Sequence, residues 1–505
     1  MKSVAFVLLV LGGLVSLEAQ LLVRPTNLKA SFMMGADVST LDQVERSGGT
    51  FQDARGKAGD ALAILKAAGI NWIRLRLWVN PVDASGQPVG GGNNDLASYL
   101  RTAARAKKLG LRVEADFHYS DFWADPSKQP IPAAWAGLST ADLHKQMYRY
   151  TFDCLKAMKA RGVLPDMVQI GNEINNGMMW PAGKLYASGD ENVGGMEGLI
   201  ALLKEGIRAT RDTSKNIRIM LHAAEGGSNA AFRNLFDPLT AAKLDYDVIG
   251  LSFYPYWHGK MSDLESNMND LASRYKKDLV VAESAYAYTL EDGDGFPNAF
   301  GPGTDKLGGY RATVQGQASE IADLIGIVAG ISDGKGIGVF YWEPAWIPAA
   351  GAGWKTGEGN NWDNQALFDA HGKALPSLDV FRLVRQKVEF PDLLVSSVEG
   401  VSLKIATGTV LQLPKQVNAV FNDDSYRVVQ VKWEEVDPVQ LESVGRITVR
   451  GSVFGYPAGA VAVIELVANA NLLGDAGFQA GIQVSGGTGQ IGLGNTDDVE
   501  LMKED

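Results

Sequence analysis

The sequence predicts an α/β fold: a (β/α)8 TIM barrel followed by a small all-β Ig-like sandwich. Between residues 31 and 390, eight short apolar runs alternate with amphipathic segments, the pattern of strands and helices in turn. Beyond Pro391 the helical periodicity stops, and β-rich runs are broken by Pro, Gly and Asp-Asp turns. Repeated strand–helix units of this kind close into a barrel whose active site lies at the C-terminal ends of the strands.

The apolar runs are short and bounded by turn residues, as buried parallel strands are. A doubly wound open sheet is the rival architecture, but no early Gly-rich phosphate loop supports it. Helix-like segments end in a glycine that suits a left-handed stop, as in Gly59–Gly69, Leu96–Gly110 and Gln146–Gly162. The expected strands are Phe32–Gly35, Trp72–Leu77, Leu111–Ala115, Met167–Ile170, Ile217–Leu221, Val248–Phe253, Leu279–Ala282 and Ile337–Tyr341.

Composition narrows the class of protein. The chain has 505 residues, 46% hydrophobic and 21% charged, which is typical of a soluble globular protein with more than one domain. A net charge of -11 argues against a nucleic-acid partner, because binding to phosphates relies on clustered Lys and Arg. Cys154 is the single cysteine, so no disulfide can form within the chain.

Residues 1–19 have the proportions of a signal peptide. The apolar core from Val4 to Leu17 is shorter than the roughly 20 residues that a membrane span needs, and Ala19 suits a cleavage site. A membrane-retained anchor is the alternative. We expect a secreted protein, extracellular or periplasmic, with no membrane span after removal of the signal.

Two segments follow the barrel. Residues 395–468 are expected to form the Ig-like sandwich, which we interpret as a rigid spacer because it has few aromatic residues to bind sugar. Residues 469–505 are expected to be either a partial β-rich carbohydrate-binding module or a tail.

Acidic and aromatic residues crowd the C-terminal ends of the expected strands. Sugar rings stack on Trp and Tyr, while carboxylates and amides bind sugar hydroxyls, so a polysaccharide is the expected substrate. The five His residues have no metal-ligand spacing, and neither a G-x-S-x-G nor an H-E-x-x-H motif occurs, which disfavours a serine hydrolase or a zinc enzyme. The crowded segments are Glu114–Pro126, Asn172 with Glu173, Ser252–Trp257, Glu283–Thr289 and Tyr341–Trp346.

Hydrolysis of a glycosidic bond needs a protonated acid and an ionised carboxylate. Glu173 and Glu283 follow the fourth and seventh expected strands and can face each other across the mouth of the barrel. Position alone does not select them, because other carboxylates also lie near strand ends, namely Glu114, Asp116, Asp247 and Glu343.

Long motifs occur in order along the barrel: GADVSTLDQVERSGGTFQD (Gly35–Asp53), RLRLWVNP (Arg74–Pro81), DFHYSDFWADPSKQ (Asp116–Gln129), QIGNEINNGMMWP (Gln169–Pro181), LHAAEGG (Leu221–Gly227), SFYPYW (Ser252–Trp257), VVAESAYAYTLEDGDG (Val280–Gly295) and WDNQALFD (Trp362–Asp369). From about Ser31 to Leu383 the chain resembles glycoside hydrolase family 53, the endo-β-1,4-galactanases. The resemblance implies that Glu173 is the general acid/base, that Glu283 is the nucleophile, and that Asn172 binds the hydroxyl next to the anomeric carbon.

The expected activity is endo-acting cleavage of β-1,4-galactan, as in type I arabinogalactan and pectin side chains, with retention and release of galacto-oligosaccharides. Retention would place the two carboxyl groups roughly 5 to 5.5 Å apart. Arg76 and Tyr254 are the expected partners of ionised Glu283. Position and resemblance add the other substrate-binding residues, Asp116, His118, Trp123, His222, Trp257 and Trp342.

The loop LEDGDGFPN (Leu290–Asn298) presents oxygen-bearing side chains at Asp292, Asp294 and Asn298. Hard cations such as Ca²⁺ take several such oxygens at a sharp turn, and the resemblance implies a structural calcium here. A plain acidic turn is the alternative. We expect no cofactor for catalysis, and a monomer.

Two other functions stay open at this point. The first is a related barrel that acts on mannan or glucan. The second is a catalytically silent carbohydrate-binding protein, although the presence of both glutamates weighs against it.

Overall fold

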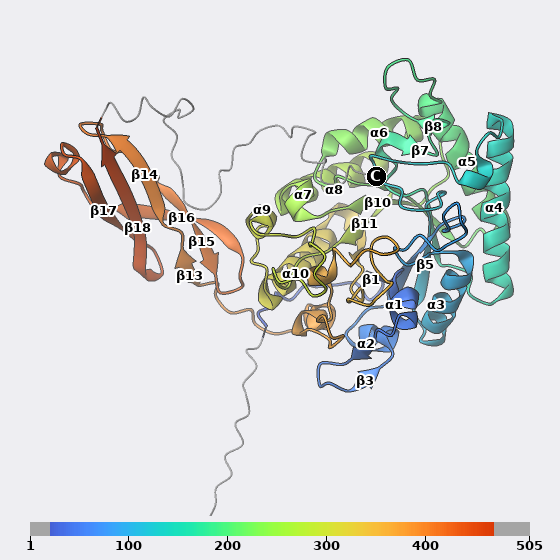
Figure 1. Cartoon of the computed structure of the whole chain (residues 1–505), viewed down its shortest axis with the longest axis horizontal. Coiled ribbons are helices and arrows are strands. Elements are labelled where there is room, and N and C mark those ends of the chain that lie inside the picture. Colours follow the sequence, from blue (N-terminus) through green and yellow to red (C-terminus); the bar gives the residue numbers. More distant parts are fainter. Residues whose placement is uncertain (1–20, 469–505) are drawn as a thin grey trace, which may run out of the picture.

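The computed structural model describes residues 21–468, so the expected signal peptide and the segment 469–505 lie outside the described residues. Eight parallel strands form a closed barrel in the order β1-β12-β11-β10-β9-β6-β5-β4, with helices around it (Figure 1). The barrel strands are β1 (Met33–Asp37), β4 (Trp72–Leu77), β5 (Arg112–Phe117), β6 (Met167–Ile170), β9 (Arg218–Ala223), β10 (Val248–Ser252), β11 (Asp278–Ser284) and β12 (Gly336–Trp342).

All eight expected strands are present, with ends that differ by at most two residues. The largest consequence is in β11, which extends to Ser284 and so includes Glu283. The backbone hydrogen bonds of a parallel strand therefore fix the position of this carboxylate.

Helices alternate with the strands, and their ends follow local sequence signals. The side chains of Asp60, Asp95 and Ser139 accept hydrogen bonds from the first turns of α2, α3 and α4. The Ser139 cap explains why α4 begins before Gln146, where apolar periodicity alone suggested a start. The helices are α1 (Leu41–Arg46), α2 (Ala61–Ala67), α3 (Leu96–Lys108), α4 (Thr140–Ala160), α5 (Gly195–Thr213), α6 (Asn229–Ala241), α7 (Pro255–His258), α8 (Met261–Tyr275), α9 (Thr304–Gly308), α10 (Val314–Gly330) and α11 (Val380–Leu383).

Short elements lie in the loops of the barrel, and one lies in a loop of the C-terminal domain. Two small hairpins pair β2 (Phe51–Gln52) with β3 (Ala58–Gly59), and β7 (Gly177–Met178) with β8 (Gly183–Lys184). The 3-10 turns are Ala133–Trp135, Ile174–Asn176, Ser332–Gly334, Asp363–Gln365, Pro376–Asp379 and Pro438–Leu441.

The barrel interior is packed apolar near the N-terminal ends of the strands and polar near their C-terminal ends. A separate cluster of buried apolar side chains fills this part of the interior: Met33, Trp72, Met167, Met220, Val248, Val280, Ala282 and Phe340. Nearer the C-terminal ends of the strands lie buried charged and polar side chains, so the fold gathers its ionisable groups at that end of the barrel.

The C-terminal strands form the predicted sandwich, drawn in orange and red in Figure 1. The strand β16 belongs to both layers, because its first half pairs with β15 and its second half with β17. Alternating apolar residues of the strands enclose a second, smaller core. The strands are β13 (Val395–Val398), β14 (Val401–Ala406), β15 (Gln416–Phe421), β16 (Tyr426–Trp433), β17 (Gly445–Val453) and β18 (Tyr456–Val467). Both parts of the predicted fold class are confirmed.

Among residues 21–468, no helix combines the length and the apolar character that crossing a membrane requires.

Candidate active site

A cleft of about 470 Å³ opens at the C-terminal ends of the barrel strands. Most of the residues that the sequence predicts for the site line this cleft, and they come from strands and loops between β4 and β12. The predicted residues that line it are Arg76, His118, Trp123, Asn172, Glu173, Tyr254, Trp257, Glu283 and Trp342.

Glu283 is held in the floor of the cleft by two donors. Nη1 of Arg74 lies 2.8 Å from Oε1, and the hydroxyl of Tyr254 donates to Oε2 at 3.2 Å. Burial and the neighbouring Glu283 charge keep the pKa of Tyr254 well above its ordinary value, so this hydroxyl keeps its proton. Both donors favour the ionised carboxylate that a nucleophile requires.

Glu173 follows β6 in a left-handed backbone conformation, with φ of 49°. This conformation is uncommon for a residue other than glycine, and it ends the strand abruptly before the Ile174–Asn176 turn. The Ser252 hydroxyl at the end of β10 donates to Oε1 of Glu173 at 2.6 Å. No cation lies within ion-pair distance of Glu173 in the described part of the chain.

The two glutamates differ in their electrostatic surroundings. Burial raises the pKa of Glu173 well above its ordinary value, the negative charge of Glu283 raises it further, and Ser252 opposes this rise. Burial also raises the pKa of Glu283, but the ion pair with Arg74 opposes that effect. Glu283 is therefore the first of the pair to ionise, and Glu173 the one that retains a proton.

Asn172 is oriented by buried side chains beneath the cleft. Its Oδ1 lies 3.1 Å from Nη2 of Arg74 and 3.0 Å from Nδ1 of His222, while its amide nitrogen donates to the Ala124 carbonyl at 2.9 Å. Burial holds the pKa of His222 well below its ordinary value, so the imidazole is neutral. Nε2 of His222 is 2.9 Å from Oγ of Ser252, which links Asn172 to the partner of Glu173.

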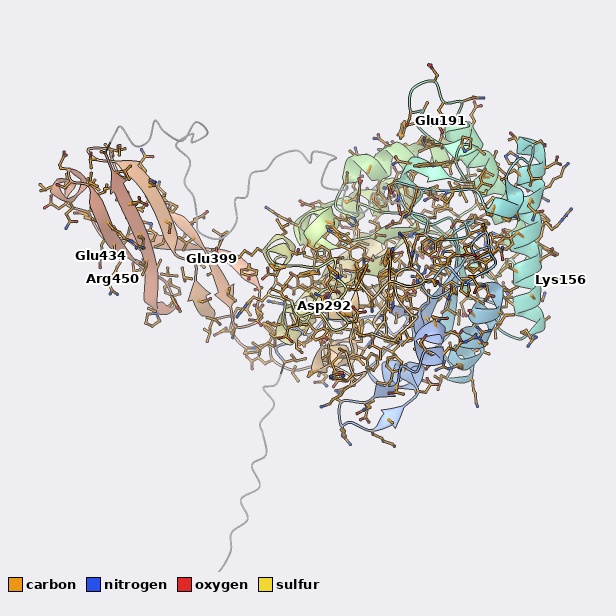
Figure 2. The ribbon with its side chains drawn as sticks, in the orientation of Figure 1. Lys156, Glu191, Asp292, Glu399, Glu434 and Arg450 are labelled. Carbon is orange, nitrogen blue, oxygen red and sulfur yellow. The ribbon has the colours of Figure 1, made fainter. Side chains whose placement is uncertain are left out.

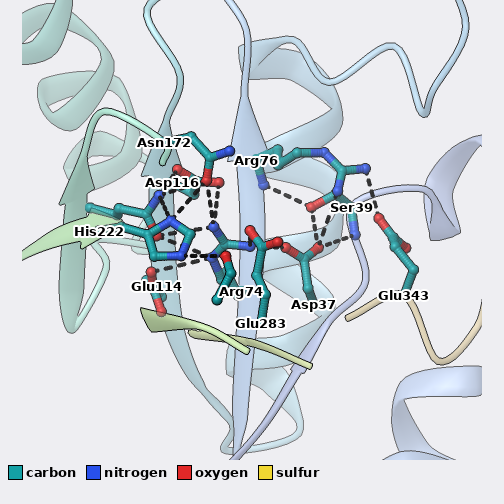
Figure 3. A network of polar contacts seen from close by, with 12 residues as sticks. Asp37, Ser39, Arg74, Arg76, Glu114, Asp116, Asn172, His222, Glu283 and Glu343 are labelled. Carbon is teal, nitrogen blue, oxygen red and sulfur yellow. Dashed lines mark hydrogen bonds and ion pairs between the residues drawn. The ribbon is translucent and has the colours of Figure 1, made fainter. Parts of the chain in front are cut away.

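Arg74, which sequence reasoning missed as a site residue, is the centre of this network (Figure 3). Its guanidinium is completely buried and pairs with Asp37 at 2.7 Å and with Asp116 at 2.9 Å as well as with Glu283. Such a cluster is stable only because each charge has a partner. The motif RLRLWVNP contains Arg74 and Arg76, and strand alternation alone does not say which of them reaches Glu283.

The structure therefore corrects the expected role of Arg76. Its Nη2 pairs with Oε1 of Glu343 at 2.7 Å, and its guanidinium carbon lies 4.3 Å from the ring centre of Trp123 and 5.4 Å from that of Trp342. Arg76 thus supports the aromatic wall of the cleft, and Arg74 holds the nucleophile candidate.

Asp116 and His222 also need a correction, because both are 0% exposed and neither borders the cleft. Asp116 bonds to Arg74 and to Nε2 of His118 at 3.0 Å. The two residues instead position side chains that line the cleft, Asp116 through His118 and His222 through Asn172.

The remaining carboxylates near strand ends do not form the acid pair. Glu114 and Glu343 are fully buried, and Glu114 accepts no hydrogen bond. Asp247 precedes β10, so it lies at the opposite end of the barrel, where it pairs with Arg211. Of all the carboxylates that the sequence places near strand ends, only Glu173 and Glu283 border the cleft.

Aromatic side chains form the rim. Trp257 is 51% exposed and is the most open of them, while neighbouring rings leave Trp123 and Trp342 only 7% and 6% exposed. Trp354 stacks on Trp123 with ring centres 4.5 Å apart, and Trp362 lies against Trp342 at 4.7 Å. Trp354 and Trp362 were not predicted, although their place after the last strand could have indicated them.

The expected calcium loop gains a ligand from a distant segment. Carboxylate oxygens of Asp292, Asp294 and Asp363 lie within 4.8 Å of one another. Asn298 donates from its amide nitrogen to Asp363 at 2.7 Å, and its Oδ1 is buried without a hydrogen bond. Burial and the two nearby aspartates raise the pKa of Asp363 to about 6. Clustered carboxylates with an unpaired buried oxygen fit a hard cation such as Ca²⁺.

Comparison with known proteins agrees with this geometry. Residues 33–381 match the family model described as glycosyl hydrolase family 53, and residues 398–456 match a bacterial Ig-like domain (group 4). A protein of Bacillus subtilis (strain 168) named endo-beta-1,4-galactanase is 40% identical over 381 residues, which cover 70% of this chain and 85% of that protein.

A protein of Thermothelomyces thermophilus named arabinogalactan endo-beta-1,4-galactanase is 33% identical, over 69% of this chain and 98% of its own length. The solved GH53 catalytic domain of Ignisphaera aggregans is 48% identical, with a TM-score of 0.70, and covers 72% of this chain and 100% of that one. With the carboxylate pair in the mouth of the barrel and a family match along its length, the chain belongs to glycosyl hydrolase family 53.

Proposed function

We propose that the protein is an endo-β-1,4-galactanase that cleaves galactan and type I arabinogalactan with retention and releases galacto-oligosaccharides. The observation that carries the proposal is the contrast between the two glutamates of one cleft. Glu283 has Arg74 and Tyr254 as donors, and Glu173 has surroundings that keep it protonated. The names of the related proteins supply the substrate class.

In the first step the Glu283 carboxylate forms a bond to the anomeric carbon, while Glu173 gives its proton to the departing glycosidic oxygen. In the second step Glu173, now ionised, removes a proton from water. The hydroxide equivalent then displaces Glu283 and regenerates both groups. The two inversions give net retention.

The cleft supplies binding as well as chemistry. Asn172, which borders the cleft, is the candidate for the hydroxyl beside the anomeric carbon. Trp257, which is half exposed, offers a face on which a sugar ring can stack, whereas Trp123 and Trp342 present only edges to the cleft. Arg76 and His118 add polar groups to its wall.

Three further properties belong to the proposal. Asp292, Asp294, Asn298 and Asp363 would hold a Ca²⁺ that stabilises the loop after β11 and takes no part in bond cleavage. The protein would act outside the cytoplasm after removal of residues 1–19, where galactan side chains of pectin are found. It would act as a monomer.

The test measures product release from linear β-1,4-galactan, with mannan and cellulose beside it, for the parent chain, Glu173→Gln and Glu283→Gln. We expect short galacto-oligosaccharides from the parent alone, with the β-anomer formed first in NMR spectra. Cleavage of a different polymer would overturn the substrate class, and initial formation of the α-anomer would overturn retention.

A further inference from the structure

The turn between β15 and β16 of the Ig-like sandwich packs against the barrel. Tyr310 and Ser425 form a short antiparallel bridge, and Tyr426 N donates to the Gly309 carbonyl at 2.8 Å. Arg311 N donates to the Asp424 carbonyl at 2.8 Å. The two domains are thus joined by main-chain hydrogen bonds, as two strands of one sheet are.

Side chains reinforce this junction. Asp423 and Ser425 are only 4% and 3% exposed, so the tip of the turn is buried. The Ser319 hydroxyl donates to the Asp423 carbonyl at 2.6 Å. Further contacts across the junction are Thr313 to Asp424 at 2.5 Å, Tyr426 to Asp305 at 2.8 Å and the ion pair of Lys306 with Glu399 at 3.0 Å. Figure 1 places α9 on the side of the barrel that faces the sandwich, and Figure 2 labels Glu399 near this junction.

The barrel side of the junction is part of the long segment that follows the nucleophile candidate. Tyr286 lies two residues beyond the end of β11, and its hydroxyl donates to the Tyr310 carbonyl at 2.5 Å and accepts from Tyr310 N at 3.1 Å. Tyr310, which pairs with the sandwich, therefore also bonds to the segment that follows Glu283 in the chain.

A second route leads to the wall of the cleft. Helix α9 packs against α7, which carries Trp257. Phe300, just before α9, lies with its ring centre 4.8 Å from that of Tyr256 and 5.0 Å from that of Tyr286. Its neighbour Ala299 lines the cleft itself.

From these contacts we propose that the Ig-like domain is a positioning element of the active site. Its β15–β16 turn holds residues 299–313 in place. These residues in turn hold α7 and the segment that follows β11 in place. A long loop at the mouth of a barrel loses conformational entropy when it is ordered, and the junction supplies hydrogen bonds that offset this loss. The effect on catalysis rests on the proposed galactanase function, whereas the ordering of the loop does not.

The test uses the full chain with Tyr426→Phe and Ser319→Ala combined, and Tyr456→Phe as the matched control. Tyr456 lies in the same domain, and its hydroxyl makes no hydrogen bond in the described part of the chain. Amide hydrogen exchange is measured over residues 285–313, with α4 as an internal reference. Values of kcat and KM on galactan are measured well below Tm, where all variants are folded.

We expect exchange over residues 299–313 to become roughly 25-fold faster in the double variant, because two hydrogen bonds are lost and each shifts local opening by about fivefold. We also expect kcat/KM on galactan to fall by a factor of about three to ten, with a change in kcat as well as in KM. The control and α4 should match the parent.

Unchanged exchange over residues 299–313 would overturn the proposal. Faster exchange with unchanged kcat and KM would overturn the link to the active site. A parent chain that does not cleave galactan would instead reject the proposed function, while the exchange result would still decide whether the sandwich orders the loop.

Discussion

The Arg74 guanidinium lies within 4 Å of four carboxyl groups from three barrel strands: Asp37 of β1, Glu114 and Asp116 of β5, and Glu283 of β11. Its planar guanidinium presents several donors in fixed directions, so a single side chain can orient Glu283 and Asn172 at once. The ammonium of lysine cannot reproduce this geometry, although it keeps the charge.

We therefore expect Arg74→Lys to lower kcat by about 10² to 10³, the usual cost of losing a preorganised donor in an active site. The variant should also have a lower Tm, because buried carboxylates lose partners. Steady-state kinetics on galactan and thermal melts provide the measurement, with Arg105→Lys, whose side chain pairs with Glu45 and Asp60 away from the cleft, as control. Near-parental kcat in Arg74→Lys would contradict this role.

Ser252 stabilises the ionised form of Glu173, because its hydroxyl donates to Oε1 and so opposes the rise of the Glu173 pKa. Removal of the hydroxyl in Ser252→Ala should raise this pKa further. Since the first step needs protonated Glu173, the alkaline limb of the pH profile of kcat/KM should move to higher pH. The measurement is that profile for the parent, Ser252→Ala and the surface control Ser262→Ala. A shift to lower pH would show that Glu173 is not the acid.

Glu114 couples protonation to folding. It is fully buried, accepts no hydrogen bond, and has its pKa raised by burial from 4.5 to about 8. Between these values the folded chain holds a proton that the unfolded chain releases, so this group stabilises the fold at low pH and loses its contribution as pH rises toward 8.

Glu114→Gln cannot ionise, so its stability relative to the parent should increase from about pH 5 to about pH 8, by up to about 4 kcal/mol. Chemical denaturation at several pH values measures this difference. Exposed Glu434→Gln is the control and should track the parent. A pH-independent difference would mean that Glu114 does not titrate in this range.

At the scale of elements, the barrel strands could be predicted because each is a short apolar run that local turn residues delimit. The strand β4 was predicted with its observed bounds, Trp72–Leu77. The direction of individual side chains could not be predicted, since Arg74 and Arg76 lie on the same strand and only barrel closure decides which meets Glu283. Asp363 was missed for a related reason: it joins Asp292 and Asp294 in space but lies in a different loop.

The loop after β11 is the element where a bound ion would act. Its carboxylates repel one another, which Ca²⁺ would relieve, so we expect CaCl₂ to raise Tm relative to EDTA in the parent. Asp294→Asn should abolish most of this difference, whereas Asp190→Asn, an exposed acid of another loop, should not. Melts with MgCl₂ test the preference for the larger ion. Equal melting temperatures of the parent in calcium and EDTA would favour the plain acidic turn.

At the scale of the whole molecule, two separate hydrophobic cores are joined by a mainly polar junction. The sandwich core is small, and a domain of this size buries too little apolar surface to be very stable by itself. With no disulfide within the chain, its stability depends on its own packing and on the contacts of the β15–β16 turn with residues 305–319. The junction should therefore couple the unfolding of the two domains.

Differential scanning calorimetry of the full chain should accordingly give one endotherm in which both domains unfold together, because loss of the sandwich would leave the buried partners of Asp423 and Ser425 exposed on the barrel. The Tyr426→Phe and Ser319→Ala double variant should separate this into two, with the sandwich melting first. Trp433 is the only tryptophan after residue 391, so the fluorescence difference between the parent and Trp433→Phe assigns each transition to a domain. Two endotherms already in the parent chain would mean that the junction carries too little free energy to couple the domains.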